Sequence, residues 1–525
     1  MGLYTLRRSL SIIEKVPFQL LVFVIIAGPS LTLALFVKKF GVNVVVSDDW
    51  YMVSLYSKMI AGTLTVGDLF AAYGGYQRFF FAGLALLLLE RITAFNVVAE
   101  MYLGWAMLTA TVGLLFYVFW VTNQVVARMR LIWYFVPASF LMFSFRQYEA
   151  ILNGFAACLI YMSVLGAVAA LVLLDRAKLR FYVLPVSILS ALVASYSYLS
   201  GLAVWPAGFV LIGLGFQDKR DAIRRFSGWC LSCAVVVALY LHNLTNTPGG
   251  LVFVSGSLFR EAESYLALIG AAFAFAPAYL VAAIGSVISI IGFLILFTTI
   301  RFRKCRTNSV LISLVAFAAF AAGTITLGRS GNGPGQVLMS RYTPMAILGS
   351  AALYLLAISI SSQLKRKSSI FSVHSLQTLI LLGLIVSAGA GWHIGQGYRA
   401  ERLMAISVLQ SYKTQPDNAI QKYLGPVPDV ADPAFIRQWA SYLEINRLNV
   451  FHVGNGTDAS LGVSRFNSAS APGLSRLARS TFFDLLWSGR LPITQLAFAT
   501  ARLGLGEFRH DSTGWCERLG WPDSS

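Results

Sequence analysis

The sequence predicts an all-α polytopic integral membrane protein, from its composition and from the recurrence of long apolar stretches. Hydrophobic residues make up 57% of the 525 and charged residues only 12%, with a mean hydropathy of +0.69. A soluble domain usually has about 25% charged residues. Stretches of roughly 20 apolar residues, enough to cross about 30 Å of hydrocarbon, recur from Pro17 to Gly395 and stop there. We therefore expect a transmembrane domain over residues 1–395 and a separate domain over residues 396–525.

The net charge of +18 is concentrated in the membrane part of the chain. Residues 396–525 hold 13 of the 41 basic side chains and 11 of the 23 acidic ones, so nearly all of the excess precedes them. Most of the basic residues before 396 fall in short clusters between apolar stretches: Arg7, Arg8 and Lys15; Arg128 and Arg130; Arg176, Lys178 and Arg180; Lys219, Arg220, Arg224 and Arg225; Arg301, Arg303, Lys304 and Arg306; Lys365, Arg366 and Lys367. Lys and Arg in short loops mark the cytoplasmic side. The charge is therefore read as topological, with the lipid bilayer and its anionic headgroups as partner and no nucleic acid.

The basic clusters fix how often the chain crosses between them. A first span over residues 16–37 runs outward, and the chain must be back inside by Arg128, so an odd number of crossings is needed. We assign that crossing to residues 97–126 and interpret residues 79–89 as a re-entrant or interfacial helix. The first outer loop then covers residues 38–96.

The same parity argument places the later spans. Residues 263–300 also allow only an odd number of crossings, so we expect an interfacial helix before Pro277 and one span after it. The other expected spans are residues 131–145, 154–174, 181–196, 199–216, 226–242, 310–327, 344–361 and 376–395. The total is about 11 transmembrane helices in the cell (inner) membrane, with the N-terminus cytoplasmic and the C-terminal domain extracytoplasmic.

The C-terminal domain is expected to be small and α-rich. Residues 417–448 have a helical pattern in two pieces, separated by Pro426, Pro428 and Pro433, because proline breaks helices. Residues 455–472 have the composition of a loop, and residues 474–487 and 493–503 show helical spacing of apolar residues. The five histidines are scattered without ligand spacing, which argues against a zinc site.

Two adjacent carboxylates, Asp48 and Asp49, stand out in the first outer loop. They follow the first span by some ten residues and precede residues 51–60, whose pattern predicts an amphipathic helix on the membrane surface. A carboxylate pair there could activate an acceptor hydroxyl as general base or help to hold a divalent cation. The competing interpretation is a helix cap, since Ser47, Asp48 and Asp49 are all good N-cap residues.

Several short motifs resemble the GT-C superfamily of membrane glycosyltransferases. The matching residues are Ser47-Asp48-Asp49-Trp50, Tyr73-Gly-Gly-Tyr-Gln77-Arg78, Arg146-Gln147-Tyr148-Glu149, Gly328-Arg329 and Ser340-Arg341-Tyr342. The resemblance covers residues 1–395 and is to an uncharacterised bacterial branch of the superfamily. Relatives often have a His before the Arg of the second motif, where this chain has Gln77.

The resemblance implies transfer of a sugar from a lipid-linked, polyprenyl-phosphate donor to a glycan, lipid or protein acceptor of the cell envelope, on the outer face, as in polysaccharide biosynthesis. Asp48 or Asp49 would act as the catalytic base, and Arg78, Arg146, Arg329 and Arg341 would neutralise the lipid phosphate, because the guanidinium fork binds phosphate oxygens bidentately. Gln77, Glu149 and Tyr342 complete the expected substrate-binding set. A metal cofactor, Mg²⁺ or Mn²⁺, stays open, and Asp48 and Asp49 would be its ligands.

Three other function classes remain at this point, one of which is a structural membrane protein without catalysis. A transporter or flippase for lipid-linked oligosaccharides would show charges in mid-span and paired halves of similar topology. A polysaccharide polymerase or ligase would rely on Arg and His in a large late outer loop, whereas the loop from Arg329 to Arg341 is short and holds no His.

Overall fold

The computed structural model describes residues 18–452, apart from residues 75, 125, 177–181, 216–218, 243–256, 274–275, 330–333, 365–366 and 426–431. The expected loop over residues 455–472 and the expected helices over residues 474–487 and 493–503 lie outside the described residues.

The described chain is built from α-helices joined by short connections. The helices are α2 (Phe18–Phe40), α3 (Asp49–Ile60), α4 (Val66–Phe70), α5 (Phe80–Thr93), α6 (Val97–Thr122), α7 (Arg128–Met142), α8 (Tyr148–Leu152), α9 (Gly154–Arg176), α10 (Val183–Ser195), α11 (Val204–Gly215), α12 (Lys219–Leu241), α13 (Leu258–Gly270), α14 (Ala278–Arg301), α15 (Ser309–Arg329), α16 (Pro334–Val337), α17 (Thr343–Leu364), α18 (Lys367–Gln410), α19 (Asp417–Leu424) and α20 (Pro433–Ile445). Short 3₁₀ turns, η1 (Phe145–Gln147), η2 (Leu199–Ala203), η4 (Ser340–Tyr342) and η6 (Asn449–Phe451), connect some of them.

Seven stretches of the described chain are helical, long and apolar enough to cross a membrane, which confirms an all-α membrane protein. They are Val97–Thr122, Gly154–Arg176, Lys219–Leu241, Ala278–Arg301, Ser309–Arg329, Ser340–Gln363 and Ile380–Gln410. Two of the other expected spans correspond to α7 and α10, with 15 and 13 residues, which is short of the roughly 20 that a crossing needs. The number of eleven spans therefore stays a prediction.

The helices divide the chain into two compact units. The first comprises Met1–Val42, Leu55–Leu89 and Val97–Ala400; the second comprises Asn43–Ser54, Glu90–Asn96 and Glu401–Ser525. The second unit thus combines the described part of the tail with two pieces of the first outer loop. Those pieces contain Asp48 and Asp49.

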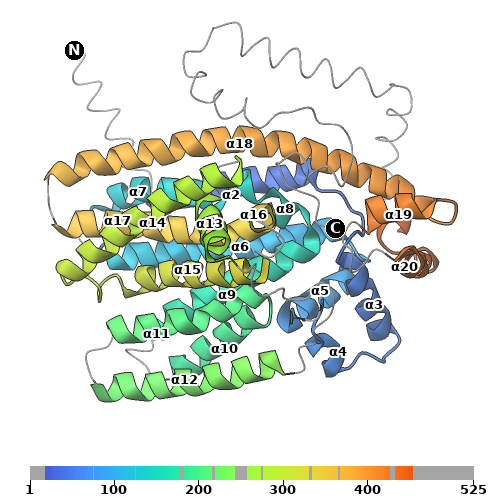
Figure 1. The fold of residues 1–525 in the computed structure, drawn as a ribbon, viewed down its shortest axis with the longest axis horizontal. Helices are drawn as coiled ribbons and strands as arrows, with labels where there is room; N and C mark the ends of the chain where they lie inside the picture. The colour runs from blue at the N-terminus through green and yellow to red at the C-terminus, as the bar shows by residue number, and fades with distance from the viewer. Residues whose placement is uncertain are drawn as a thin grey trace, which may run out of the picture. The chain divides into compact units, whose positions relative to one another are not determined.

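The first unit is a bundle whose long helices pack closely where glycines face them. Helix α6 packs against α9, and α15 packs against both α9 and α17; Figure 1 shows these helices running side by side. Pro277 caps α14 and separates it from α13, as predicted. A Cβ on Gly285 of α14 would lie 1.8 Å from the Leu266 carbonyl oxygen of α13, so no side chain fits at this crossing.

Two residues of the tail, Leu424 and Asn449, hydrogen-bond to the outer loop and hold the second unit together. The Leu424 carbonyl oxygen, at the end of α19, accepts hydrogen bonds from the Ser47 amide (2.8 Å) and the Trp50 indole N–H (2.9 Å). The buried Asn449 donates from its backbone to the Ala94 carbonyl (3.0 Å) and from its side chain to the Phe95 carbonyl (2.8 Å). Each of the two outer-loop pieces is therefore connected to the tail by hydrogen bonds.

Candidate functional site

Two arginines and three tyrosines converge in the first unit, and we refer to Tyr76, Tyr198, Arg329, Arg341 and Tyr342 as the arginine–tyrosine cluster. Arg329, the last residue of α15, donates a hydrogen bond to the Tyr76 hydroxyl, and its guanidinium carbon lies 5.2 Å from the centre of the Tyr76 ring. The Arg341 guanidinium carbon lies 5.5 Å from the centre of the Tyr342 ring. These are cation–π contacts. Both arginines remain partly exposed.

Tyr198 joins the cluster from the turn before η2, which packs against α15. Burial raises the pKa of Tyr198 well above its usual range; the neighbouring Tyr342 adds to this rise, and the charges of Arg341 and Arg329 oppose it. The phenol therefore stays protonated and can donate a hydrogen bond. The cluster offers two guanidinium groups and three aromatic rings.

A scaffold of hydrogen bonds holds Arg341 beside Glu149. The Ser340 hydroxyl donates to the Arg146 carbonyl (2.8 Å) and accepts from the Glu149 amide (3.1 Å). The Arg341 and Glu149 side chains form an ion pair at 3.7 Å. The Arg341 side chain is 27% exposed and the Glu149 side chain is 24% exposed. The separation of 3.7 Å is long for an ion pair and both side chains are partly exposed, so we expect Arg341 to be able to exchange Glu149 for an anionic ligand.

Arg146 occupies a different position from the other predicted arginines. Its side chain is 5% exposed and donates to the Leu338 carbonyl at 3.1 Å. Burial lowers the pKa of Arg146 to about 10, so the guanidinium still carries its charge at neutral pH. The structure thus brings together Arg146 and Glu149 of one sequence motif with Arg341 and Tyr342 of another.

Arg78 is engaged by backbone carbonyls. Its Nε donates to the Tyr240 carbonyl at 2.9 Å, and its two terminal nitrogens donate to the carbonyls of His242 and Phe70. The helix α12 ends at Leu241, so Arg78 satisfies carbonyls at a helix end, where cations stabilise best. Gln77, also buried, pairs through its backbone with Tyr73 in a tight turn. Three of the five Arg78 N–H donors are used in this way, and its predicted role in phosphate binding is untested.

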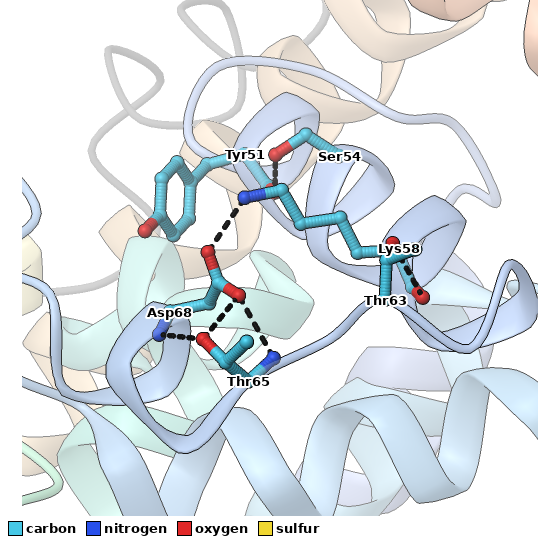
Figure 2. Close-up of polar contacts among 6 residues, drawn as sticks. All are labelled: Tyr51, Ser54, Lys58, Thr63, Thr65 and Asp68. Atoms are coloured by element: carbon cyan, nitrogen blue, oxygen red, sulfur yellow. Dashed lines mark hydrogen bonds and ion pairs between the residues drawn. The ribbon is translucent and has the colours of Figure 1, made fainter.

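The outer-loop segment before this turn is fixed by one ion pair and one helix cap. Figure 2 shows Lys58 of α3 reaching Asp68 of α4, with 2.6 Å between the ammonium and the carboxylate. Asp68 also accepts from the Thr65 amide and hydroxyl, while the Thr65 hydroxyl accepts from the Asp68 amide, which is a capping box. The Lys58 and Thr65 hydrogen bonds lower the pKa of Asp68 well below its usual range.

The two predicted catalytic carboxylates have different environments in the second unit. Asp49 begins α3, is 3% exposed and accepts a hydrogen bond from the Val46 amide at 3.1 Å. It therefore holds the turn before the helix through the Val46 amide, and the capping interpretation stays a prediction. Asp48, the residue before Asp49, is half-buried.

Glu90, near the end of α5, is a second buried carboxylate of the same unit. Its side chain is 1% exposed, and both of its carboxylate oxygens lack a hydrogen-bond partner among the described residues, as does Oδ1 of Asp49. Burial, and then the charge of Asp49, raise the pKa of Glu90 well above its usual range. Burial is also the main cause that raises the pKa of Asp49 to about 7, against the opposing effects of the Val46 hydrogen bond and the Arg402 charge.

The backbone of the second unit carries most of the strained conformations. Six non-glycine residues among those described have a positive φ angle, and five of them belong to this unit: Ser47, Ala94, Phe95, Arg447 and Asn449. Such conformations cost of order 1–3 kcal/mol each and collect at functional sites. The strain lies at the same turns that present Asp48 and follow Glu90.

The described residues do not favour a metal centre. Within the ranges that the structure describes, no group of three His, Cys, Asp or Glu side chains is arranged to hold a metal ion. Asp48 and Asp49 alone are too few for a protein cage, although Mg²⁺ can bind through one or two carboxylates with water and phosphate. We therefore assign no step of chemistry to a metal.

The predicted set omitted Tyr76, Tyr198 and Glu90. Tyr76 lies within the second quoted motif and Tyr198 within a predicted tight turn, but tyrosines are common in membrane proteins and neither position is distinguished by pattern. Glu90 is one of few acids before residue 396, which was the available signal. Its burial depends on tertiary packing.

Comparison with family models, curated proteins and solved structures found no match to this chain.

Proposed function

We propose that this chain is a membrane glycosyltransferase that transfers a sugar from a polyprenyl-phosphate donor to a glycan or lipid acceptor of the cell envelope. The observation that carries the proposal is the arginine–tyrosine cluster. Arg329 and Arg341 offer positive charge for a phosphate, and the tyrosine rings of the cluster offer the amphipathic surfaces that suit a polar ring. The motifs that suggested this chemistry from sequence contribute four of its five residues.

The arginines act on the leaving group. In displacement at the anomeric carbon, the bond from the sugar to the phosphate oxygen breaks, and that oxygen gains negative charge. Charge stabilisation by preorganised donors is then the largest available contribution. Arg329 and Arg341 supply it, and Arg341 does so by releasing Glu149. The leaving group needs no proton, because a phosphate is stable as an anion.

Asp48 is the proposed base for the acceptor hydroxyl. A base must reach the proton that it accepts, and Asp48 is half-buried whereas Asp49 is almost fully enclosed. Asp49 instead holds the turn through the Val46 amide. The acceptor oxygen forms the new bond to the anomeric carbon as its proton passes to Asp48.

The experiment is sugar transfer by the purified protein from a panel of radiolabelled polyprenyl-phosphate sugars. We expect Asp48→Asn to lower the rate by about 10²- to 10⁴-fold, the usual contribution of a general base. Asp49→Asn keeps an acceptor for the Val46 amide and is the matched control, with a smaller effect. Transfer that survives in Asp48→Asn, or no transfer by the wild type from any donor, would contradict the proposal and favour a transporter or a polymerase.

The proposed reaction needs the cell membrane, with the N-terminus cytoplasmic and the tail outside. This orientation is supported by the basic clusters between spans. It is tested with single cysteines at two exposed positions, Asn446→Cys and Thr307→Cys, in a variant without native cysteines. We expect an impermeant thiol reagent added outside to label residue 446 alone, and labelling of residue 307 alone would invert the topology.

A further inference from the structure

A group of buried hydroxyls near the arginine–tyrosine cluster has no hydrogen-bond partner among the residues that the structure describes. Five Ser or Thr hydroxyls in the described part of the chain are buried in this way: Ser197, Ser200, Ser264, Thr326 and Ser387. Ser387 lies on α18. The other four, which we call the hydroxyl group, lie on the turn leading into η2 or on η2 itself (Ser197 and Ser200), on α13 (Ser264) and on α15 (Thr326), and both η2 and α13 pack against α15.

Two members of the hydroxyl group, Ser264 and Thr326, differ from the helical hydroxyls that bond within their own helix. A helical hydroxyl usually donates to the carbonyl one turn earlier, as Ser313 does to Ser309 on the same α15, at 2.8 Å. Ser264 and Thr326 are also helical, but they do not make this bond. A buried hydroxyl without a partner costs about 1–3 kcal/mol, so such groups call for an explanation.

Three members of the hydroxyl group lie close in sequence to residues of the arginine–tyrosine cluster, and the fourth, Ser264, lies on a helix that packs against α15. Thr326 precedes Arg329 by one helical turn on α15, so both lie on one face of that helix. Ser197 and Ser200 flank Tyr198, whose phenol interacts electrostatically with both Arg341 and Arg329. A ligand whose phosphate contacts the arginines would therefore have its neighbouring atoms near these hydroxyls.

The chemistry of the site favours an uncharged ligand rich in hydroxyls. Each Ser or Thr hydroxyl can both donate and accept, which matches a sugar hydroxyl. Glu261, one turn before Ser264 on α13, has a buried carboxylate oxygen without a partner among the described residues. That carboxylate would repel a second anionic group.

We propose that Ser197, Ser200, Ser264 and Thr326 form a subsite for the uncharged, polyhydroxylated sugar of the donor, next to the arginines that bind its phosphate. This inference rests on the proposed function and deepens it, because it assigns the sugar end of the donor to named residues and excludes sugar acids.

The test measures dissociation constants in lipid nanodiscs for two kinds of probe: polyprenyl phosphate alone, and polyprenyl phosphate bearing mannose, glucose or arabinose. We expect Ser200→Ala, Ser264→Ala and Thr326→Val each to weaken binding of a sugar-bearing probe about three- to tenfold, one hydrogen bond's worth, and to leave the bare phosphate unaffected. Ser387→Ala, which removes an equally buried hydroxyl on α18, is the matched control and should change neither probe.

The outcomes separate the two proposals. Equal effects of the hydroxyl variants on both probes, or no effect on either, would overturn the subsite and leave these hydroxyls with water. A uronic acid probe that binds as tightly as its uncharged counterpart would also overturn it. Arg329→Gln and Arg341→Gln should weaken both probes, and unchanged binding in these variants would instead reject the proposed function. Thermal unfolding checks the fold, because removing an unpartnered hydroxyl should not destabilise it.

Discussion

The arginine–tyrosine cluster of the first unit and the Asp49–Glu90 pair of the second both contain ionisable side chains, but the environments of these side chains are opposite. Arg329 and Arg341 have aromatic or carboxylate partners and stay half-exposed. Asp49 and Glu90 are at most 3% exposed, and three of their four carboxylate oxygens lack a partner among the described residues. The first arrangement keeps charge available to a ligand, whereas the second suppresses it by desolvation. The difference teaches that an ionisable side chain of this protein can offer its charge to a ligand only where solvent also reaches it.

The largest expected effect on binding concerns Arg341 of the arginine–tyrosine cluster. Arg341→Gln should weaken binding of polyprenyl phosphate about tenfold to a hundredfold, since charged hydrogen bonds contribute about 1.5–3 kcal/mol. Arg260→Gln, which changes an exposed arginine on α13, is the control and should have no effect. The measurement is the dissociation constant in nanodiscs, and equal loss in both variants would show only a general electrostatic effect.

The pH dependence of stability comes next, because it depends on the buried pair. The pKa of Asp49 is raised from 3.8 in the unfolded chain to about 7 in the folded one. The unfolded chain therefore releases this proton first, so the contribution of Asp49 to folding stability is greatest below pH 4 and is lost as the pH rises toward 7. Glu90→Gln removes a second carboxyl whose pKa is raised by burial, and should flatten this fall.

The measurement is the thermal unfolding temperature between pH 4 and pH 8, for the wild type and Glu90→Gln. Glu401→Gln, an exposed position of the same unit, is the control and should follow the wild type. A wild-type stability that rises over this range, with Glu90→Gln unchanged, would mean that the pair is ionised and partnered.

The smallest expected effect concerns the Lys58–Asp68 ion pair in Figure 2. Its Lys side chain is 48% exposed, and exposed ion pairs contribute little. Asp68→Asn should destabilise the fold only slightly, mainly by weakening the Thr65 cap, and Lys58→Gln less still. Urea unfolding of both variants checks this. Because the folded pKa of Asp68 is lowered, the wild type should lose this small advantage as the pH falls below 4.

Sequence predicted the elements better than it predicted the site. The helix from Asp49 to Ile60, the break at Pro277 and the split of the tail into α19 and α20 follow from local patterns and proline chemistry. Arg341, Tyr342 and Arg329 were predicted from short motifs, and the structure brings them together. Arg78 came from the same reasoning, but its partners are the carbonyls of Phe70, Tyr240 and His242, which no local pattern reveals.

The sequence by itself determined that this is an all-α membrane protein, because apolar length and the scarcity of charge are properties of each segment taken alone. It also determined the breaks at Pro277 and between α19 and α20, because proline chemistry acts on neighbouring residues. Only the tertiary structure decided that Asp49 and Glu90 are desolvated together, that Arg78 caps α12, and that the four members of the hydroxyl group have no partner among the described residues. Burial and hydrogen-bond partnership depend on residues distant in the chain, so they exist only once the helices have packed.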